Sequence, residues 1–238
     1  MAGVNQQRPG SVPTTRPPSA LVTGATRGIG LAIAQVLGTT HHVIVGGRQF
    51  AAVQRVVAEL PSASAFVADL ADEAETAAAA SAIGQLDVLV HCAGVMPPAD
   101  ASVRDAWRQV LEVNVVGVVH LTELLLPVLR SSSGLVVFVN SGSGLRAMGD
   151  TTGYSASKFA LTSFADGLRE SERGRVRVSS LHPGRVDTDM QRDLQARAGR
   201  SYRAGDHLTT SSVAAVVRAI VDAPPEGVLE SVSIRPAG

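Results

Sequence analysis

The sequence predicts a single-domain, doubly wound α/β fold, with a mostly or fully parallel seven-stranded sheet and helices on both faces. Short aliphatic runs alternate with longer helical patterns from residue 19 to residue 238. The runs are almost continuously apolar, which is typical of parallel strands covered by helices on both sides. A glycine-rich turn follows the first run, and 238 residues with 45% hydrophobic content suit one such domain.

Each expected element rests on a local pattern of the chain. Asp72 precedes an alanine-rich segment, where its carboxylate can cap the free amides of a helix. Ser211 or Ser212 is expected to begin the last helix, which the prolines at 224–225 interrupt. A polar segment at about 186–210 lacks a strong period and is expected to form a substrate lid with short helices. Strands are expected at about 20–22, 43–45, 65–67, 86–90, 135–139, 176–181 and 228–234, and helices at about 29–37, 50–60, 72–83, 104–129, 153–172 and 212–221.

Composition argues against several classes of partner. Basic and acidic residues balance at 21 each and aromatic residues make up 3%, so neither a nucleic acid nor an acidic membrane is expected as a partner. The single cysteine, Cys92, excludes an intrachain disulfide, and no apolar run is expected to span a membrane. Residues 1–18 lack the apolar core of a signal peptide. We expect a disordered leader there, with an organellar presequence as the alternative, on a cytoplasmic protein.

Residues 23–30 read TGATRGIG and lie between the first expected strand and the first helix. Glycines there let the backbone approach a pyrophosphate, which free amides at the helix start would bind; an ordinary chain reversal is the alternative. The second strand ends in Gly-Gly-Arg48, without the acid that binds the ribose 2′-hydroxyl of NAD. Arg27 and Arg48 can bond a 2′-phosphate instead. NADP(H) is therefore expected over NAD(H), unless both arginines are merely solvated.

Lys158 is the only lysine in the chain, whose other basic residues are all arginine, and it follows Tyr154 by four positions. On a helix these two side chains share one face. A compact ammonium with rotatable donors suits a task that a rigid guanidinium does not. A nearby cation favours the phenolate, and a shift of about 3 pKa units would bring a tyrosine from about 10 to near neutrality. The pair is expected to be a proton donor and its activating cation.

With these motifs the chain resembles the short-chain dehydrogenase/reductase family over about residues 19–236. The resemblance implies a Rossmann fold. TGATRGIG is similar to the family's TGxxxGxG turn, and YSASK to its YxxxK pair. Asn114, and Ser141 thirteen residues before Tyr154, match the rest of its Asn-Ser-Tyr-Lys tetrad. The resemblance implies that Ser141 and Tyr154 contact the substrate, that Lys158 binds the nicotinamide ribose, and that Asn114 holds a water in the proton relay.

The resemblance also implies which residues bind the cofactor. The segment His182-Pro183-Gly184 followed by Thr188 matches the PGxxxT segment along the nicotinamide, and Asp69 matches the residue that contacts the adenine. The implied cofactor-binding residues are Gly24, Thr26, Arg27, Gly28, Ile29, Gly30, Arg48, Asp69, Leu70, Cys92, Ala93, Gly94, Tyr154, Lys158, Pro183, Gly184, Val186 and Thr188.

The expected activity is hydride transfer between NADP(H) and a ketone or secondary alcohol, as in a carbonyl reductase or a hydroxy-acid or alcohol dehydrogenase. The alternatives are a 3-oxoacyl thioester reductase and, in another class, a catalytically silent NADP-binding regulator. The resemblance implies a homodimer or homotetramer.

Some of these residues have a structural alternative. Ser141 lies in a Ser/Gly-rich segment where serine is common for turn reasons, and Ser143 could be mistaken for it. Asn114 could be a packing residue, since Asn competes for backbone bonds. His182 is expected to be structural, and the six histidines lack metal-ligand spacing, so no metal site is expected.

Three segments leave questions open. Residues 91–94 read His-Cys-Ala-Gly where many relatives have Asn-Asn-Ala-Gly, so a side chain that braces the sheet is replaced, and Cys92 is expected to act as a small hydrophobe. The chain ends without the Asp-Gly-Gly of fatty-acid-type reductases, which disfavours an acyl-carrier substrate. The lid arginines could bind a substrate carboxylate or belong to a solvated, mobile lid: Arg192, Arg197, Arg200 and Arg203.

Overall fold

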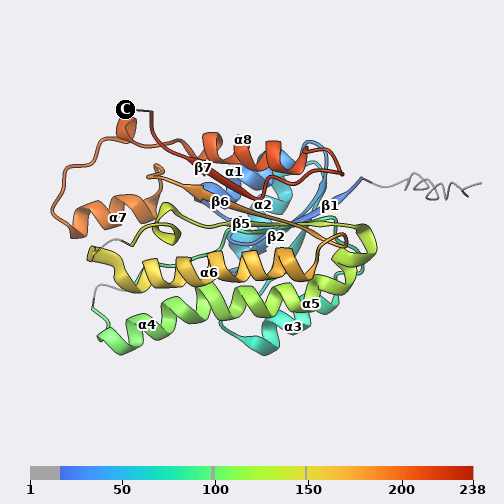
Figure 1. Cartoon of the computed structure of the whole chain (residues 1–238), viewed down its shortest axis with the longest axis horizontal. Helices are drawn as coiled ribbons and strands as arrows, with labels where there is room; N and C mark the ends of the chain where they lie inside the picture. Colours follow the sequence, from blue (N-terminus) through green and yellow to red (C-terminus); the bar gives the residue numbers. More distant parts are fainter. Residues whose placement is uncertain (1–16, 98–99, 148, 238) are drawn as a thin grey trace, which may run out of the picture.

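The computed structural model describes residues 17–97, 100–147 and 149–237, which form three layers. The strands are β1 (Ser19–Val22), β2 (His42–Gly47), β3 (Ala63–Val67), β4 (Val88–His91), β5 (Leu135–Val139), β6 (Arg177–Pro183) and β7 (Ser231–Ile234). The α-helices are α1 (Gly28–Leu37), α2 (Phe50–Glu59), α3 (Glu73–Ser81), α4 (Val103–Leu111), α5 (Gly117–Ser132), α6 (Thr152–Ser171), α7 (Asp189–Arg197) and α8 (Thr210–Val221). Helices α1, α2 and α8 cover one face of the sheet and α3 to α6 the other (Figure 1), each group over its own cluster of buried apolar side chains.

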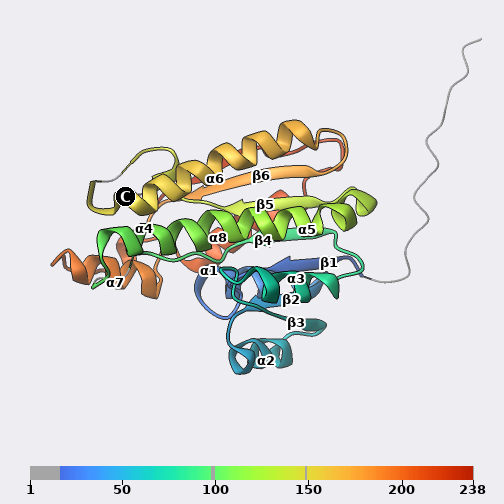
Figure 2. The same cartoon turned by 90° about the horizontal axis from the view of Figure 1, so that it is seen from below.

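The strands lie in the order β3-β2-β1-β4-β5-β6-β7, and every neighbouring pair is parallel. Figure 2 shows this order from β6 to β3. The predicted doubly wound parallel fold is confirmed. The strand order reverses between β1 and β4, and open parallel sheets bind ligands outside the carboxyl ends of the strands at this point. The glycine-rich turn begins there, directly after β1.

The helix expected at 104–129 is longer and is not uniform. A single π-helical turn, Glu112–Val116, joins α4 to α5 and contains Asn114. The Asn114 side chain bonds the backbone of Val95, accepting from its amide at 2.8 Å and donating to its carbonyl at 3.0 Å. Single π-turns within helices are frequent at functional sites, and this one is too short to disturb the apolar period on which the prediction rested.

Two of the expected helix starts can be compared with the observed caps. Asp72 caps α3 as predicted, accepting from the amide of Glu75 at 2.9 Å. The expected start of the last helix at Ser211 or Ser212 is wrong, because Thr209 is the cap and accepts from the Ser212 amide at 3.1 Å. Strand β7 begins three residues later than expected, and most of the expected leader lies outside the described residues.

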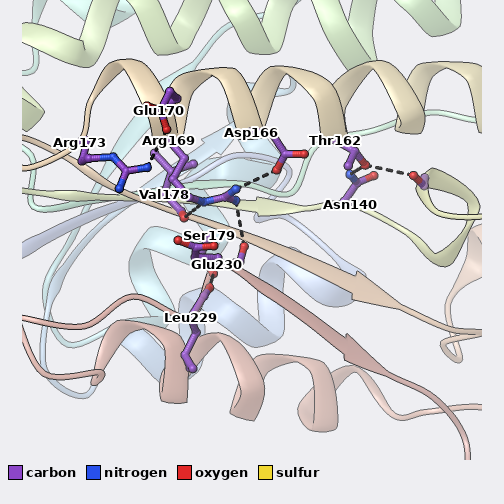
Figure 3. Close-up of polar contacts among 11 residues, drawn as sticks. Asn140, Thr162, Asp166, Arg169, Glu170, Arg173, Val178, Ser179, Leu229 and Glu230 are labelled. Atoms are coloured by element: carbon purple, nitrogen blue, oxygen red, sulfur yellow. Dashed lines mark hydrogen bonds and ion pairs between the residues drawn. The ribbon is translucent and has the colours of Figure 1, made fainter.

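One arginine fixes the position of α6 against the sheet. The Arg169 guanidinium donates to the carbonyl oxygens of Val178 at 3.1 Å and Glu230 at 3.0 Å, and it pairs with Asp166 at 2.8 Å (Figure 3). Arg169 therefore joins α6 to β6 and to the residue that precedes β7. This attachment matters for function because α6 carries Tyr154 and Lys158.

The continuous stretch Val103–Ser132 is long and apolar enough to cross a membrane, by length and composition only. The sequence-based expectation missed this, but a helix in the core of a globular fold passes the same test. Here one side of the stretch packs against α3 and α6. Its other side leaves Val116 and Leu124 exposed. Trp107 is partly exposed on the side that faces α6, where a Cβ on Gly153 would lie 3.3 Å from its ring.

Candidate active site

Close backbone approaches shape the turn after β1. Gly24 has a φ of +66°, and a Cβ there would lie 2.9 Å from the Cα of Ala93. Gly28 has a φ of +57°, and a Cβ at Gly30 would lie 2.2 Å from the carbonyl oxygen of Gly24. No side chain caps the start of α1, so its first amides can bind an anion. This cradle fits the pyrophosphate of a dinucleotide.

A cavity of about 270 Å³ opens over the turn. Most of the predicted cofactor-binding residues line it, namely Gly24, Thr26, Arg27, Gly28, Ile29, Gly30, Arg48, Asp69, Leu70, Cys92, Ala93, Gly94, Tyr154, Lys158 and Thr188. Among the described residues that were predicted, Pro183, Gly184 and Val186 do not line it. Val186 is buried, and Arg235 and Pro236 cover the side of Gly184 that a Cβ would occupy.

Tyr154 and Lys158 share one face of α6, as predicted, with the Lys158 Nζ 5.7 Å from the centroid of the tyrosine ring. Lys158 is only 4% exposed, and its Nζ donates to the Val139 carbonyl at 3.4 Å. Burial lowers the pKa of Lys158 to about 8, an effect that Cys92 opposes. The ammonium remains the main form at pH 7.

The expected lowering of the tyrosine pKa is not observed in the protein alone. Burial raises the pKa of Tyr154, and a hydrogen bond with the Ser141 side chain opposes this only in part. Desolvation of the phenolate therefore outweighs the Ser141 hydrogen bond that favours it. Tyr154 is a neutral phenol at pH 7, which is the form that donates a proton.

Ser141 lies two residues after the end of β5, and its side chain is hydrogen-bonded to Tyr154, as the thirteen-residue spacing predicted. Its Oγ also accepts from the Ser143 amide at 3.1 Å. The preceding residue, Asn140, donates to the Lys158 carbonyl at 3.2 Å and to the Thr162 hydroxyl at 2.8 Å. Figure 3 shows the contact with Thr162 between the end of β5 and α6. Ser141 and α6 are therefore held in register by the residue between Ser141 and β5.

Asn114 lies behind the cavity and does not line it. It is 1% exposed and donates to the Ser157 hydroxyl at 3.1 Å. A Cβ on Gly94 would lie 3.4 Å from the Asn114 Oδ1 and 3.8 Å from the Lys158 Nζ, so Gly94 separates the two side chains. Asn114 joins α6 to the segment after β4, which agrees with the packing alternative and leaves the water-holding role untested.

The two predicted phosphate-binding arginines are exposed at the cavity and carry weak ion pairs. Arg27 lies 3.4 Å from Asp189, and Arg48 lies 3.5 Å from Asp69. Their side chains are 75% and 64% exposed, so neither pair is worth much in water. The carboxylate beside Arg48 belongs to Asp69, two residues after β3, and not to a residue of β2.

Residues 91–94, which depart from the Asn-Asn-Ala-Gly of many relatives, are held by other hydrogen bonds. Thr23 accepts hydrogen bonds from the amides of Cys92 and Ala93 at 3.0 and 3.1 Å. His91 lies 2.9 Å from the Thr122 hydroxyl. Burial raises the pKa of the Cys92 thiol to about 12, so the thiol stays neutral, in agreement with the small hydrophobe expected.

The family model described as short chain dehydrogenase matches residues 18–199. The chain belongs to the short-chain dehydrogenase family. It is 34% identical to dehydrogenase/reductase SDR family member 7B of Mus musculus, over 85% of this chain and 69% of that protein. It is 35% identical to benzil reductase ((S)-benzoin forming) of Saccharomyces cerevisiae, over 75% of each chain. A crystal structure of actinorhodin polyketide ketoreductase with NADPH superposes with a TM-score of 0.83 and 26% identity, over 92% of this chain and 96% of that one.

The lid arginines of this short-chain dehydrogenase have partners of their own. Arg192 pairs with Asp187 at 2.7 Å and Arg203 with Asp206 at 3.0 Å. Arg197 donates to a carbonyl in the segment after β4 at 2.7 Å. A substrate carboxylate would have to displace one of these partners, which weakens that alternative for Arg192 and Arg203.

Three polar cavity-lining residues of this dehydrogenase were missed by sequence reasoning: Thr23, Asn140 and Asp189. Thr23 had a signal, because it is the first letter of the TGxxxGxG turn. Asn140 and Asp189 had none, since their partners lie on other elements. Within the described part of the chain, no three His, Cys, Asp or Glu side chains gather as metal ligands would.

Replacing Lys158 by Met should stabilise this short-chain dehydrogenase at pH 7. The folded-state pKa of about 8 lies below the ordinary 10.5, so the unfolded chain binds more protons between these values and stability rises with pH across that window. At pH 7 the full penalty of about 3 kcal/mol is present, and Met removes it at nearly equal volume. We expect a melting temperature about 5 °C higher or more at pH 7, with a smaller gain at pH 10.

Thermal unfolding of Lys158→Met against the exposed control Arg173→Met would measure this. An unchanged or lower melting temperature for Lys158→Met at pH 7 would contradict the buried-charge penalty.

Proposed function

We propose that the protein is an NADP(H)-dependent oxidoreductase that transfers a hydride between nicotinamide and a ketone or secondary alcohol, as a carbonyl reductase or alcohol dehydrogenase. One observation carries the proposal. A neutral tyrosine, hydrogen-bonded to a serine and backed by the only lysine of the chain, lies at a glycine-lined cavity that fits a dinucleotide. Benzil reductase and polyketide ketoreductase, named among its relatives, both reduce carbonyl groups, which supports the same reaction class.

The nicotinamide, when bound, supplies the hydride for the carbonyl carbon. Tyr154 donates its phenolic proton to the carbonyl oxygen, so that C=O becomes CH–OH. Ser141 hydrogen-bonds the same oxygen and stabilises the charge that develops on it. Lys158 places a positive charge beside the tyrosine and favours the phenolate that proton donation leaves behind. In the oxidation direction, that phenolate is the base.

The structure also bears on partners. The exposed Val116 and Leu124 on the π-turn and α5 support the expected homodimer or homotetramer. A monomer mass in sedimentation equilibrium would contradict it. A cytoplasmic location remains part of the proposal.

The substrate class is tested by following NADPH consumption with ketones, keto acids and 3-oxoacyl thioesters. We expect turnover of simple ketones above that of acetoacetyl thioesters. Faster thioester turnover would instead support the 3-oxoacyl reductase alternative. NADPH binding without turnover of any carbonyl would support the silent regulator and contradict the proposed activity.

Cofactor choice is tested by changing both Arg27 and Arg48 to Ala. Each guanidinium lies at the cavity with only a weak carboxylate partner, so each is available for a 2′-phosphate. The double variant loses two charge-assisted bonds of about 1.5 kcal/mol or more each, so we expect it to lose about 100-fold or more in NADPH affinity. Its NADH affinity should fall less than threefold. Equal losses for the two cofactors, measured by titration calorimetry, would contradict NADP selection.

A further inference from the structure

The residue after β7 folds over the ends of two neighbouring strands. Arg235 Nη1 donates to the carbonyl oxygens of His182 and Ile234, the latter at 3.0 Å. The ring of His182 continues the connection, since its Nδ1 lies 3.1 Å from the carbonyl oxygen of Ser141. Two steps therefore link the C-terminal segment to the serine that meets Tyr154.

The loops on either side fit closely around this arginine. A Cβ on Gly142 would lie 3.1 Å from Arg235 Nη2, and a Cβ on Gly184 would lie 2.9 Å from Arg235 Cδ. Both glycines thus give room to the same side chain. Arg235 fills the space between the loop after β5, which contains Ser141, and the loop after β6.

His182 is suited to hold a carbonyl. It is 1% exposed, and its pKa is lowered mainly by burial, with Arg235 acting in the same direction and the bond to Ser141 opposing both. The ring is neutral at pH 7. Because its partner is a carbonyl oxygen, Nδ1 carries the proton and donates it, a tautomer assigned from the hydrogen-bond network.

The guanidinium has no ion pair among the described residues. Its Nη1 donates to two backbone carbonyls at the carboxyl ends of β6 and β7. Bonds from a charged donor are about twice as strong as neutral ones, so this arrangement fixes the main chain at His182. The Ser141 main chain is fixed in turn, because its carbonyl accepts from both His182 and the Gly144 amide, the latter at 3.0 Å.

We propose that Arg235 and His182 are positioning residues that hold Ser141 in hydrogen-bond reach of Tyr154 and the substrate oxygen. The inference rests on the proposed role of Ser141 in carbonyl reduction. It makes the segment after β7, remote in sequence from the Tyr-Lys pair, a part of the active site. A misplacement of about 1 Å at a reacting group can cost about 100-fold in rate, so losing the brace should slow the reaction without affecting cofactor affinity.

Kinetics test the functional consequence. We expect Arg235→Ala and His182→Leu to lower kcat about tenfold with an unchanged Kd for NADPH. His182→Asn, whose amide can donate from the position of Nδ1, should stay within about threefold of wild type, and Arg185→Ala, an exposed arginine near His182, should match wild type. In a Ser141→Ala background, Arg235→Ala should cost nothing further. Full additivity of the two changes would overturn the proposal.

Amide hydrogen exchange on the protein without cofactor tests the brace itself. The peptide covering residues 140–146 should exchange at least fivefold faster in Arg235→Ala and His182→Leu, and at the wild-type rate in His182→Asn and Arg185→Ala. If the 140–146 peptide of Arg235→Ala exchanged at the wild-type rate, the positioning role of Arg235 would be overturned, even if the enzyme is active. A wild-type protein that reduces no carbonyl would instead overturn the proposed function, so the two failures are distinguishable.

Discussion

The burial of Lys158 is the constraint on which the site depends. The ammonium of a lysine that is 4% exposed, with the Val139 carbonyl as a hydrogen-bond partner at 3.4 Å, costs free energy to bury. The lowered pKa of about 8 measures that cost. The charge is useful only if Tyr154 and the cofactor cavity stay beside it, so the surrounding structure must hold α6 in one place. The buried charge lowers the free energy of unfolding, and in return the active site has an ammonium in a fixed position.

Contacts from three directions hold α6 there. Arg169 binds it to β6 and to the entry of β7, Asn140 binds it to the end of β5, and Ser157 receives the bond from Asn114 in the π-turn. Each contact ends on backbone or on a buried side chain, which fixes position better than a surface ion pair does. The helix that carries the proton donor is thus held at the start of β6, just before β7, at the carboxyl end of β5 and at the π-turn.

The doubly wound parallel fold, the glycine turn and the Tyr154–Lys158 pair were predictable, because each depends on residues close together in the sequence or on a period of the chain. The contacts of Asn140, Asp189 and Arg235 were not, since each joins elements that only the folded sheet brings together. The cap of the last helix was misplaced because Thr209, Ser211 and Ser212 are all good capping residues within one turn. The predicted direction of the shift in the Tyr154 pKa was wrong, because the sequence shows a nearby cation but not how deeply the phenol is buried.

The central claim is that Tyr154 is the proton donor at a cofactor site that does not depend on its hydroxyl. The most direct test uses the Tyr154→Phe variant and a ketone that the wild-type protein reduces. Stopped-flow measurements give the rate of hydride transfer, and fluorescence titration gives the affinity for NADPH. The account predicts a loss of at least 1,000-fold in the hydride-transfer rate, consistent with about 10² to 10⁴ for a positioned general acid, with NADPH affinity within about twofold of wild type. Turnover retained within tenfold of wild type would contradict the assignment.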